Sequence, residues 1–132
     1  MAYIRPPWFV QKIFNPLAMM SGMSGAATLA IRGRTSGALR KVPVIPVEVD
    51  GAKYIVSTRG ESEWVRNLRA AGEAELTRKG QTERVRATEV PAAERGPIIE
   101  AYRKVAGKTV EPYWKSLPDA VDHPVFRVDH VS

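Results

Sequence analysis

The 132-residue sequence contains no cysteine and only two histidines, His123 and His130. Without thiols the chain has no disulfide, no thiolate metal site and no cysteine nucleophile, and two histidines make a poor zinc site. We therefore expect no bound metal. His123 stands beside Pro124, where a structural position at the start of a strand is favoured over a catalytic role.

Charge is missing from residues 13–31, so a signal peptide or a membrane span has to be considered. Asn15-Pro16 and the serines and glycines that follow break this run well short of the roughly 20 apolar residues that a spanning helix needs. We therefore expect a cytoplasmic protein.

Apolar residues at helical spacing predict one helix behind Pro6-Pro7. They are Phe9, Ile13, Leu17 and Met20. We expect this helix to pack on the core, and a peripheral contact with a membrane surface stays open as the alternative.

Acidic residues are in the minority, since 14 Asp and Glu stand against 20 Lys and Arg, giving a net charge of +6. This balance favours anionic partners such as phosphoesters, nucleic acid or an acidic membrane face. We expect no nucleic-acid partner, because interleaved exposed aromatic residues and a recognition helix are absent. At this length, with 44% apolar residues, we expect one domain over residues 1–132.

Beyond Gly25 the apolar period changes from helix to strand. It predicts a strand over 27–32, a turn over 33–37 and a second strand over 39–49. Pro43 and Pro46 each remove a ladder donor, so the second strand is expected to be an edge strand or to carry a bulge. Asp50-Gly51 lies between two apolar runs and predicts a hairpin.

The rest of the chain alternates less regularly between helices and strands. Ser62 and Gly72 bound one expected helix, and Pro91 and Gly107 bound another whose apolar stripe is Ile98, Ile99, Tyr102 and Val105. Strands are expected over 73–78, 82–90 and 125–128. Because helices do not alternate regularly with strands, we predict a mainly β, α+β fold: an antiparallel barrel with peripheral helices.

The clearest functional signal is Gly33-Arg34-Thr35-Ser36-Gly37, followed by Arg40-Lys41-Val42-Pro43. Two glycines allow a tight turn whose N–H groups can converge on one oxyanion. The hydroxyls of Thr35 and Ser36, with nearby guanidiniums, would add donors. The pattern therefore predicts a site for a phosphorylated ligand.

Four segments follow one another along the chain: Pro7-Trp8-Phe9 to Asn15-Pro16, the turn motif with Arg40 and Pro43, Ser57-Thr58-Arg59-Gly60, and Trp64 to Asn67. In this order and at these spacings they resemble the deazaflavin-dependent nitroreductase and quinone reductase family. The resemblance covers nearly the whole chain and implies a split β-barrel. It also implies binding of coenzyme F-420, an 8-hydroxy-5-deazaflavin that carries a phosphodiester and an oligoglutamate tail.

The resemblance implies that a strand backbone runs along the deazaflavin ring just before Arg59, and that Asn67 hydrogen-bonds near the phosphate end. Trp64 would wall the pocket, and a core position is an equally weighted alternative for it. The motif and the resemblance together give one set of cofactor-binding residues. They are Arg34, Thr35, Ser36, Arg40, Lys41, Pro43, Val56, Ser57, Thr58, Arg59, Trp64 and Asn67.

The activity that the resemblance implies is hydride transfer from the reduced deazaflavin to an electron-poor acceptor such as a quinone, an enone or a nitro compound. Thr58 and Tyr113 are the candidate catalytic residues, with Tyr102 as a further candidate, since a nearby hydroxyl can donate a proton. The alternative is a non-catalytic protein of the same fold that holds the deazaflavin or a fatty acyl chain. We expect a monomer or a weak dimer.

Overall fold

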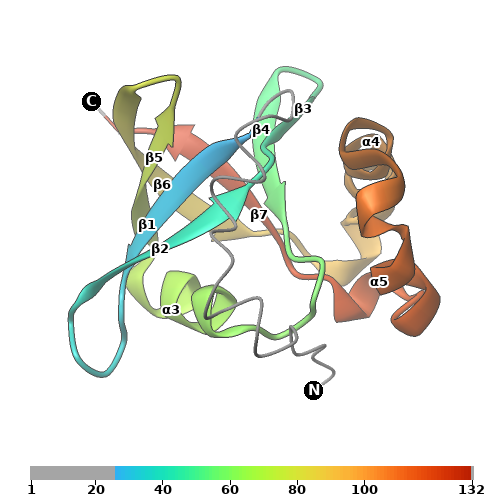
Figure 1. The fold of residues 1–132 in the computed structure, drawn as a ribbon, viewed down its shortest axis with the longest axis horizontal. Coiled ribbons are helices and arrows are strands. Elements are labelled where there is room, and N and C mark those ends of the chain that lie inside the picture. The colour runs from blue at the N-terminus through green and yellow to red at the C-terminus, as the bar shows by residue number, and fades with distance from the viewer. Residues whose placement is uncertain (1–25, 132) are drawn as a thin grey trace.

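The computed structural model describes residues 26–131, which contain seven strands. The strands are β1 (Ala27–Arg32), β2 (Leu39–Val44), β3 (Val47–Val49), β4 (Ala52–Val56), β5 (Glu73–Arg78), β6 (Gln81–Glu89) and β7 (Val125–His130). All neighbours pair antiparallel, in the spatial order β2-β1-β5-β6-β7-β4-β3. The sheet curls into a half-barrel, which confirms the mainly β, antiparallel fold (Figure 1).

Within the described part of the chain, three α-helices stand at the periphery of this sheet (Figure 1). They are α3 (Glu63–Ala71), α4 (Gly96–Ala106) and α5 (Glu111–Ser116). Short 3-10 turns precede α4 (Ala92–Glu94), connect α4 to α5 (Gly107–Val110) and precede β7 (Ala120–Asp122). Helix α3 packs against β1, whereas α4 packs against β3 at the other end of the sheet. The expected peripheral helices are therefore confirmed.

The strand predicted over 39–49 is wrong as one element, because it divides at Ile45-Pro46. Among the described strands β2 pairs with β1 alone and β3 with β4 alone, so the two pieces form opposite edges of the sheet. Proline lacks the N–H that a central strand would have to donate, which suits both pieces to edge positions. The expectation of an edge strand is confirmed.

The β3–β4 hairpin turns at Asp50-Gly51, as predicted. Val49 pairs with Ala52, and φ is 52° at Asp50 and 81° at Gly51. Two successive positive φ values are typical of the tight turn whose twist matches that of the strands.

Helix α3 begins after Ser62 and ends at Gly72, whose left-handed conformation lets its N–H donate to Leu68 O at 2.8 Å. Val65 and Leu68 are fully buried. The predicted bounds are confirmed. Ser62 does not cap the helix with its side chain, however, and its buried hydroxyl has no hydrogen-bond partner among residues 26–131.

Helix α4 buries most of its predicted stripe, including Ile98, Ile99 and Tyr102. The prediction was wrong for Val105, whose exposed fraction is 49%, because Ala106 completes the buried face instead. Helix α5 was not predicted at all. Six residues are too few to show a helical period, although Trp114 on this helix is buried.

Two apolar cores share strand β4. The first fills the inside of the curled sheet and includes Leu29, Ile55 and Phe126, and the second joins α4 and α5 to the sheet and includes Val56. Burial of each large apolar side chain stabilises the fold by roughly 1.5–3 kcal/mol. The last residues of β4 thus alternate between the cores, and the turn that follows lies where the cores meet.

The helix expected behind Pro6-Pro7 lies outside the described residues, and so does the membrane contact proposed for it. Within residues 26–131 no helix is long and apolar enough to cross a bilayer.

Candidate functional site

The glycine-flanked turn between β1 and β2 is held by hydrogen bonds among its own residues. Gly33 N–H donates to Ala38 O at 2.8 Å, Gly37 N–H donates to Gly33 O at 2.9 Å, and Ala38 N–H donates to Ser36 Oγ at 3.2 Å. A Cβ on Gly33 would lie 3.2 Å from Ser36 Oγ, so glycine permits this close approach.

Arg34 ties this turn to helix α3. Its backbone N–H and its Nη1 donate to Asn67 Oδ1 at 3.1 and 2.8 Å, and Asn67 itself is buried. The turn N–H groups without a partner among residues 26–131 are therefore those of Thr35 and Ser36. Only these two turn N–H groups therefore remain available to an oxyanion, fewer than the sequence led us to expect. The side-chain Nδ2 of Asn67 is a further donor without a partner in the described part of the chain.

Three guanidiniums gather around the carboxylate of Glu63 at the start of α3; we call Arg34, Arg40 and Arg66 the basic cluster. Nη1 of Arg34 lies 3.1 Å from Glu63 Oε1, and Nη1 of Arg66 lies 3.9 Å from Glu63 Oε2. The hydrogen bond from Arg34 is the main cause that lowers the pKa of Glu63, and the charges of Arg66 and Arg40 add to it. Three cations against one carboxylate leave a net positive site for an anion.

The two basic residues of β2 do not share a face. Arg40 pairs with Ile31 and lies on the face of the first core, whereas Lys41 pairs with Ala30 on the opposite face. Pro43 pairs with Thr28 and shares the face of Lys41. The structure therefore brings Arg34 and Arg40 together and places Lys41 and Pro43 elsewhere.

The second part of the predicted site is the Ser57–Gly60 turn after β4. Ser57 is fully buried: its N–H donates to Pro124 O at 2.9 Å, and its hydroxyl donates to Gly60 O at 2.7 Å. Val56 is buried before it. Ser57 and Val56 thus shape the turn from inside, and the half-buried Thr58 and Arg59 form its outward part.

Arg59 reaches Tyr113, although the two residues lie on distant segments. Arg59 Nη2 donates to Tyr113 Oη at 3.2 Å, and the guanidinium carbon lies 5.5 Å from the centre of the ring. Since the Tyr113 hydroxyl accepts this bond, its own proton stays free to be donated. Arg59 Nε is buried without a partner in the described part of the chain, and there the Thr58 hydroxyl has none either. The structure therefore places the candidate Tyr113 against Arg59, the residue that follows the candidate Thr58.

Two other aromatic candidates, Trp64 and Tyr102, pack in the apolar cores. Trp64 packs on the first core, with its ring centre 6.3 Å from that of Phe126, and is half buried. Tyr102 is buried against Trp114, and burial raises the pKa of Tyr102 far above its usual value, so it stays neutral. These contacts favour the core position for Trp64 and exclude Tyr102 from the exposed surface.

His123 is structural, as expected. It is fully buried, with Nδ1 at 2.9 Å from Ser57 O and Nε2 at 2.6 Å from Leu117 O. Its ring stacks on Trp114 at 4.1 Å between centres, with an angle of 11°. His123 thus supports the Ser57–Gly60 turn from the C-terminal side.

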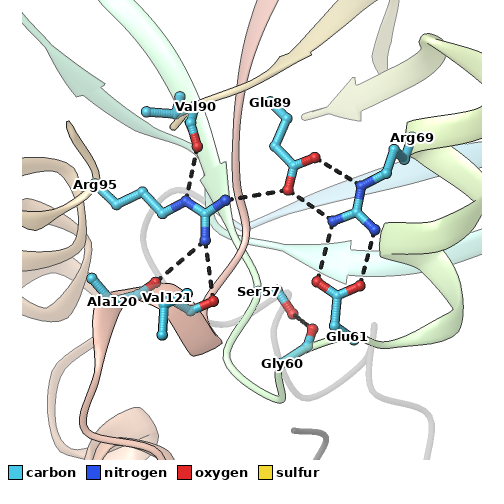
Figure 2. A network of polar contacts seen from close by, with 9 residues as sticks. All are labelled: Ser57, Gly60, Glu61, Arg69, Glu89, Val90, Arg95, Ala120 and Val121. Atoms are coloured by element: carbon cyan, nitrogen blue, oxygen red, sulfur yellow. Dashed lines mark hydrogen bonds and ion pairs between the residues drawn. The ribbon is translucent and has the colours of Figure 1, made fainter. Parts of the chain in front are cut away.

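Sequence reasoning missed a chain of four charged residues beside this turn (Figure 2). Arg69 binds Glu61 at 2.9 and 3.1 Å and Glu89 at 2.7 and 2.8 Å, and Arg95 binds Glu89 at 3.2 Å. Glu61 and Arg95 are buried. The hydrogen bond from Arg69 is the largest cause that lowers the pKa of Glu61. Four scattered positions carry no common sequence pattern, so no signal in the sequence could have joined them.

Solved structures share this fold at low sequence identity. An F420-H2 Dependent Reductase (FDR-A) is 23% identical, with 80% of this chain and 95% of that chain covered and a TM-score of 0.55. A NimC/NimA family protein from Clostridium acetobutylicum is 19% identical over 78% and 72% of the chains, with a TM-score of 0.53. A chain described as a domain-swapped dimer is 24% identical over 81% of each chain, with a TM-score of 0.57. Whether the present chain is a monomer or a weak dimer stays a prediction.

No protein of curated function matches the sequence. A family model does match, and it covers residues 12–117, which contain the β1–β2 turn, the Ser57–Gly60 turn, α3 and Tyr113. The matched family consists of reductases that use coenzyme F-420. The chain therefore belongs to the F420H(2)-dependent quinone reductase family.

Proposed function

We propose that the chain binds reduced coenzyme F-420 between the basic cluster and the Ser57–Gly60 turn, and that it delivers hydride to an electron-poor small molecule such as a quinone, an enone or a nitro compound. The observation that carries this proposal is the convergence of both parts at the start of α3. Asn67 and Glu63 of α3 hold Arg34, and Gly60 lies just before the helix. A helix N-terminus adds a further preference for anions.

The residues present fit the cofactor. Its phosphodiester and oligoglutamate tail are polyanionic, and the basic cluster offers three guanidiniums with one carboxylate among them. The orphaned, buried Nε of Arg59 is a donor without an acceptor in the described part of the chain. A buried polar group that lacks a partner is costly, so an acceptor supplied by a ligand would stabilise it.

When bound, the reduced deazaflavin supplies the hydride, and the chain supplies position and a proton. Arg34 and Arg40 would hold the anionic tail, and Thr58 and Arg59 would orient the ring. The Tyr113 hydroxyl, whose proton is left free by the bond from Arg59, would protonate the reduced acceptor.

The test is oxidation of chemically reduced coenzyme F-420 by the purified protein, with a panel of quinones, enones and nitro compounds. We expect turnover with at least one class, and we expect Tyr113→Phe to lower kcat about 100-fold, the lower end of general-acid contributions. Tyr54→Phe, a half-buried tyrosine of β4, is the control. Cofactor binding without turnover on any acceptor would favour the non-catalytic carrier instead, and an unchanged kcat in Tyr113→Phe would assign the proton to another donor.

A pair of variants tests how Asn67 acts. Its Oδ1 is taken by Arg34, so its amide N–H group is the part left for a phosphate. We expect Asn67→Ala to raise the Kd for coenzyme F-420 about 10-fold, the scale of one charge-assisted bond, and Asn67→Asp to raise it further because a carboxylate would face the phosphate. The Kd values come from fluorescence titration.

The Asn67→Asp variant keeps an acceptor for Arg34. Which of the two variants has the higher Kd for coenzyme F-420 therefore decides how Asn67 acts. Wild-type affinity in Asn67→Asp, with weak binding in Asn67→Ala, would restrict Asn67 to holding Arg34 in place.

A further inference from the structure

We propose that Glu61 is a positioning residue for the cofactor: the ion-pair chain from Glu61 through Arg69 and Glu89 to Arg95 fixes the Ser57–Gly60 turn, and with it Thr58 and Arg59, relative to Tyr113. This inference rests on the function proposed above. None of the four charged residues belongs to the set that would touch the cofactor.

Glu61 fixes the C-terminal end of the turn. It follows Gly60 directly, and its carboxylate receives two hydrogen bonds from the forked guanidinium of Arg69, at 2.9 and 3.1 Å (Figure 2). Its exposed fraction is only 8%. A bidentate pair fixes orientation as well as distance, so the backbone next to Gly60 has one favoured position.

Ser57 fixes the N-terminal end of the turn. Its N–H donates to Pro124 O, its carbonyl oxygen faces Nδ1 of His123 at 2.9 Å, and its hydroxyl closes the turn onto Gly60 O. Thr58 and Arg59 lie between these two fixed ends of the turn. Within residues 26–131 the only side-chain hydrogen bond of either residue is the one from Arg59 to Tyr113. The positions of Thr58 and Arg59 are therefore set by the contacts at the two ends of the turn.

Arg95 links the contacts of Glu61 at one end of the turn to those of Ser57 at the other. On one side its Nη2 binds Glu89, which also binds Arg69. On the other side its Nη1 donates to the carbonyl oxygens of Ala120 and Val121 at 3.3 Å, just before His123. Its Nε donates to Val90 O at 2.8 Å, so all three nitrogens are engaged (Figure 2).

Stability alone is a weak reason for such an arrangement. Desolvation of buried charges offsets most of their attraction, and apolar replacements of similar size are often as stable. A linked set of charges does, however, fix geometry, because each member has one arrangement that satisfies all its partners. In this chain the geometry that it fixes is that of the turn that carries Thr58 and Arg59.

The test compares Glu61→Gln and Glu61→Ala with the control Glu73→Gln, in which a half-exposed carboxylate of β5 loses its 3.6 Å contact with Arg84. Three quantities are measured: the Kd for coenzyme F-420, amide hydrogen exchange of residues 57–61 in the free protein, and the thermal midpoint. We expect Glu61→Ala to raise the Kd about 10-fold and to speed exchange across the turn, since small misplacements in a binding site have effects of this order or larger. Glu61→Gln keeps one carbonyl oxygen for Arg69 and should give an intermediate Kd, and Glu73→Gln should match the wild type.

A merely structural role predicts a different result. Glu61→Gln would then lower the thermal midpoint and leave the Kd and the exchange of residues 57–61 unchanged at a temperature where the protein is folded, which would overturn the inference. Absence of binding by the wild-type protein would instead overturn the proposed function, and the inference with it.

Discussion

Arg34→Ala is expected to weaken the binding of coenzyme F-420 by roughly 1.5–3 kcal/mol, the range of a charge-assisted hydrogen bond, which is about 10- to 150-fold in Kd. Arg34 stands at the centre of the basic cluster, with Nη1 at 2.8 Å from Asn67 Oδ1 and 3.1 Å from Glu63 Oε1. Arg40→Ala is expected to have an effect in the same range, because its guanidinium lies beside Gly33 in the same cluster. Fluorescence titration measures both.

The fold should survive both changes, since Arg34 is partly exposed in the turn after β1 and Arg40 is exposed on the edge strand β2. Arg84→Ala is the matched control: this exposed arginine of β6 pairs only loosely with Glu73, at 3.6 Å, and lies outside the basic cluster. Its affinity should equal that of the wild type. If Arg34→Ala and Arg40→Ala also bound the cofactor as tightly as the wild type, the basic cluster would have no part in binding.

The largest expected loss of stability belongs to His123→Ala. This ring is fully buried, stacks on Trp114 and faces two carbonyl oxygens, those of Ser57 and Leu117. Its removal leaves a cavity and takes the ring away from the buried Ser57 carbonyl and the part-buried Leu117 carbonyl, so we expect the free energy of unfolding to fall by about 3–5 kcal/mol. Urea denaturation at neutral pH, followed by tryptophan fluorescence, measures it.

The second histidine offers the control. His130 is exposed on β7, and its Nδ1 lies 3.0 Å from Glu83 Oε2. Surface pairs of this kind contribute about 0–1 kcal/mol, so His130→Ala should change stability little. Equal losses in the two variants would mean that the buried contacts of His123 do not stabilise the fold as described.

Local rules were enough where one residue type permits one backbone geometry. Asp50-Gly51 gave the β3–β4 hairpin, because successive positive φ values favour this pair. Gly72 gave the end of α3 for a similar reason. Such positions need no information from the rest of the chain.

Local rules failed where the partner of a segment decides its structure. The apolar pattern over 39–49 reads as one strand, but β2 and β3 end on opposite edges of the sheet, a choice made by their neighbours β1 and β4. Helix α5 is only six residues long, and Trp114 is buried there by the second core rather than by any helical period.

The site shows the same division. The chemistry of the turn motif predicted Arg34 and Arg40 as cofactor-binding residues, and the family resemblance added Arg59; the structure places Arg34 and Arg40 together. Pairing register, which the sequence does not reveal, puts Lys41 on the other face of β2. The contacts of Arg59 with Tyr113 and of Arg69 with Glu61 join segments that are distant in sequence, so only the fold could bring them together.

The most direct test of the account is a fluorescence titration of the purified wild-type protein with coenzyme F-420, with FMN and NADPH as competitors. We predict saturable binding that neither competitor displaces and that weakens as salt rises, because the basic cluster holds the anionic tail. No binding, or equal competition by FMN, would contradict the assignment of these two turns as a deazaflavin site.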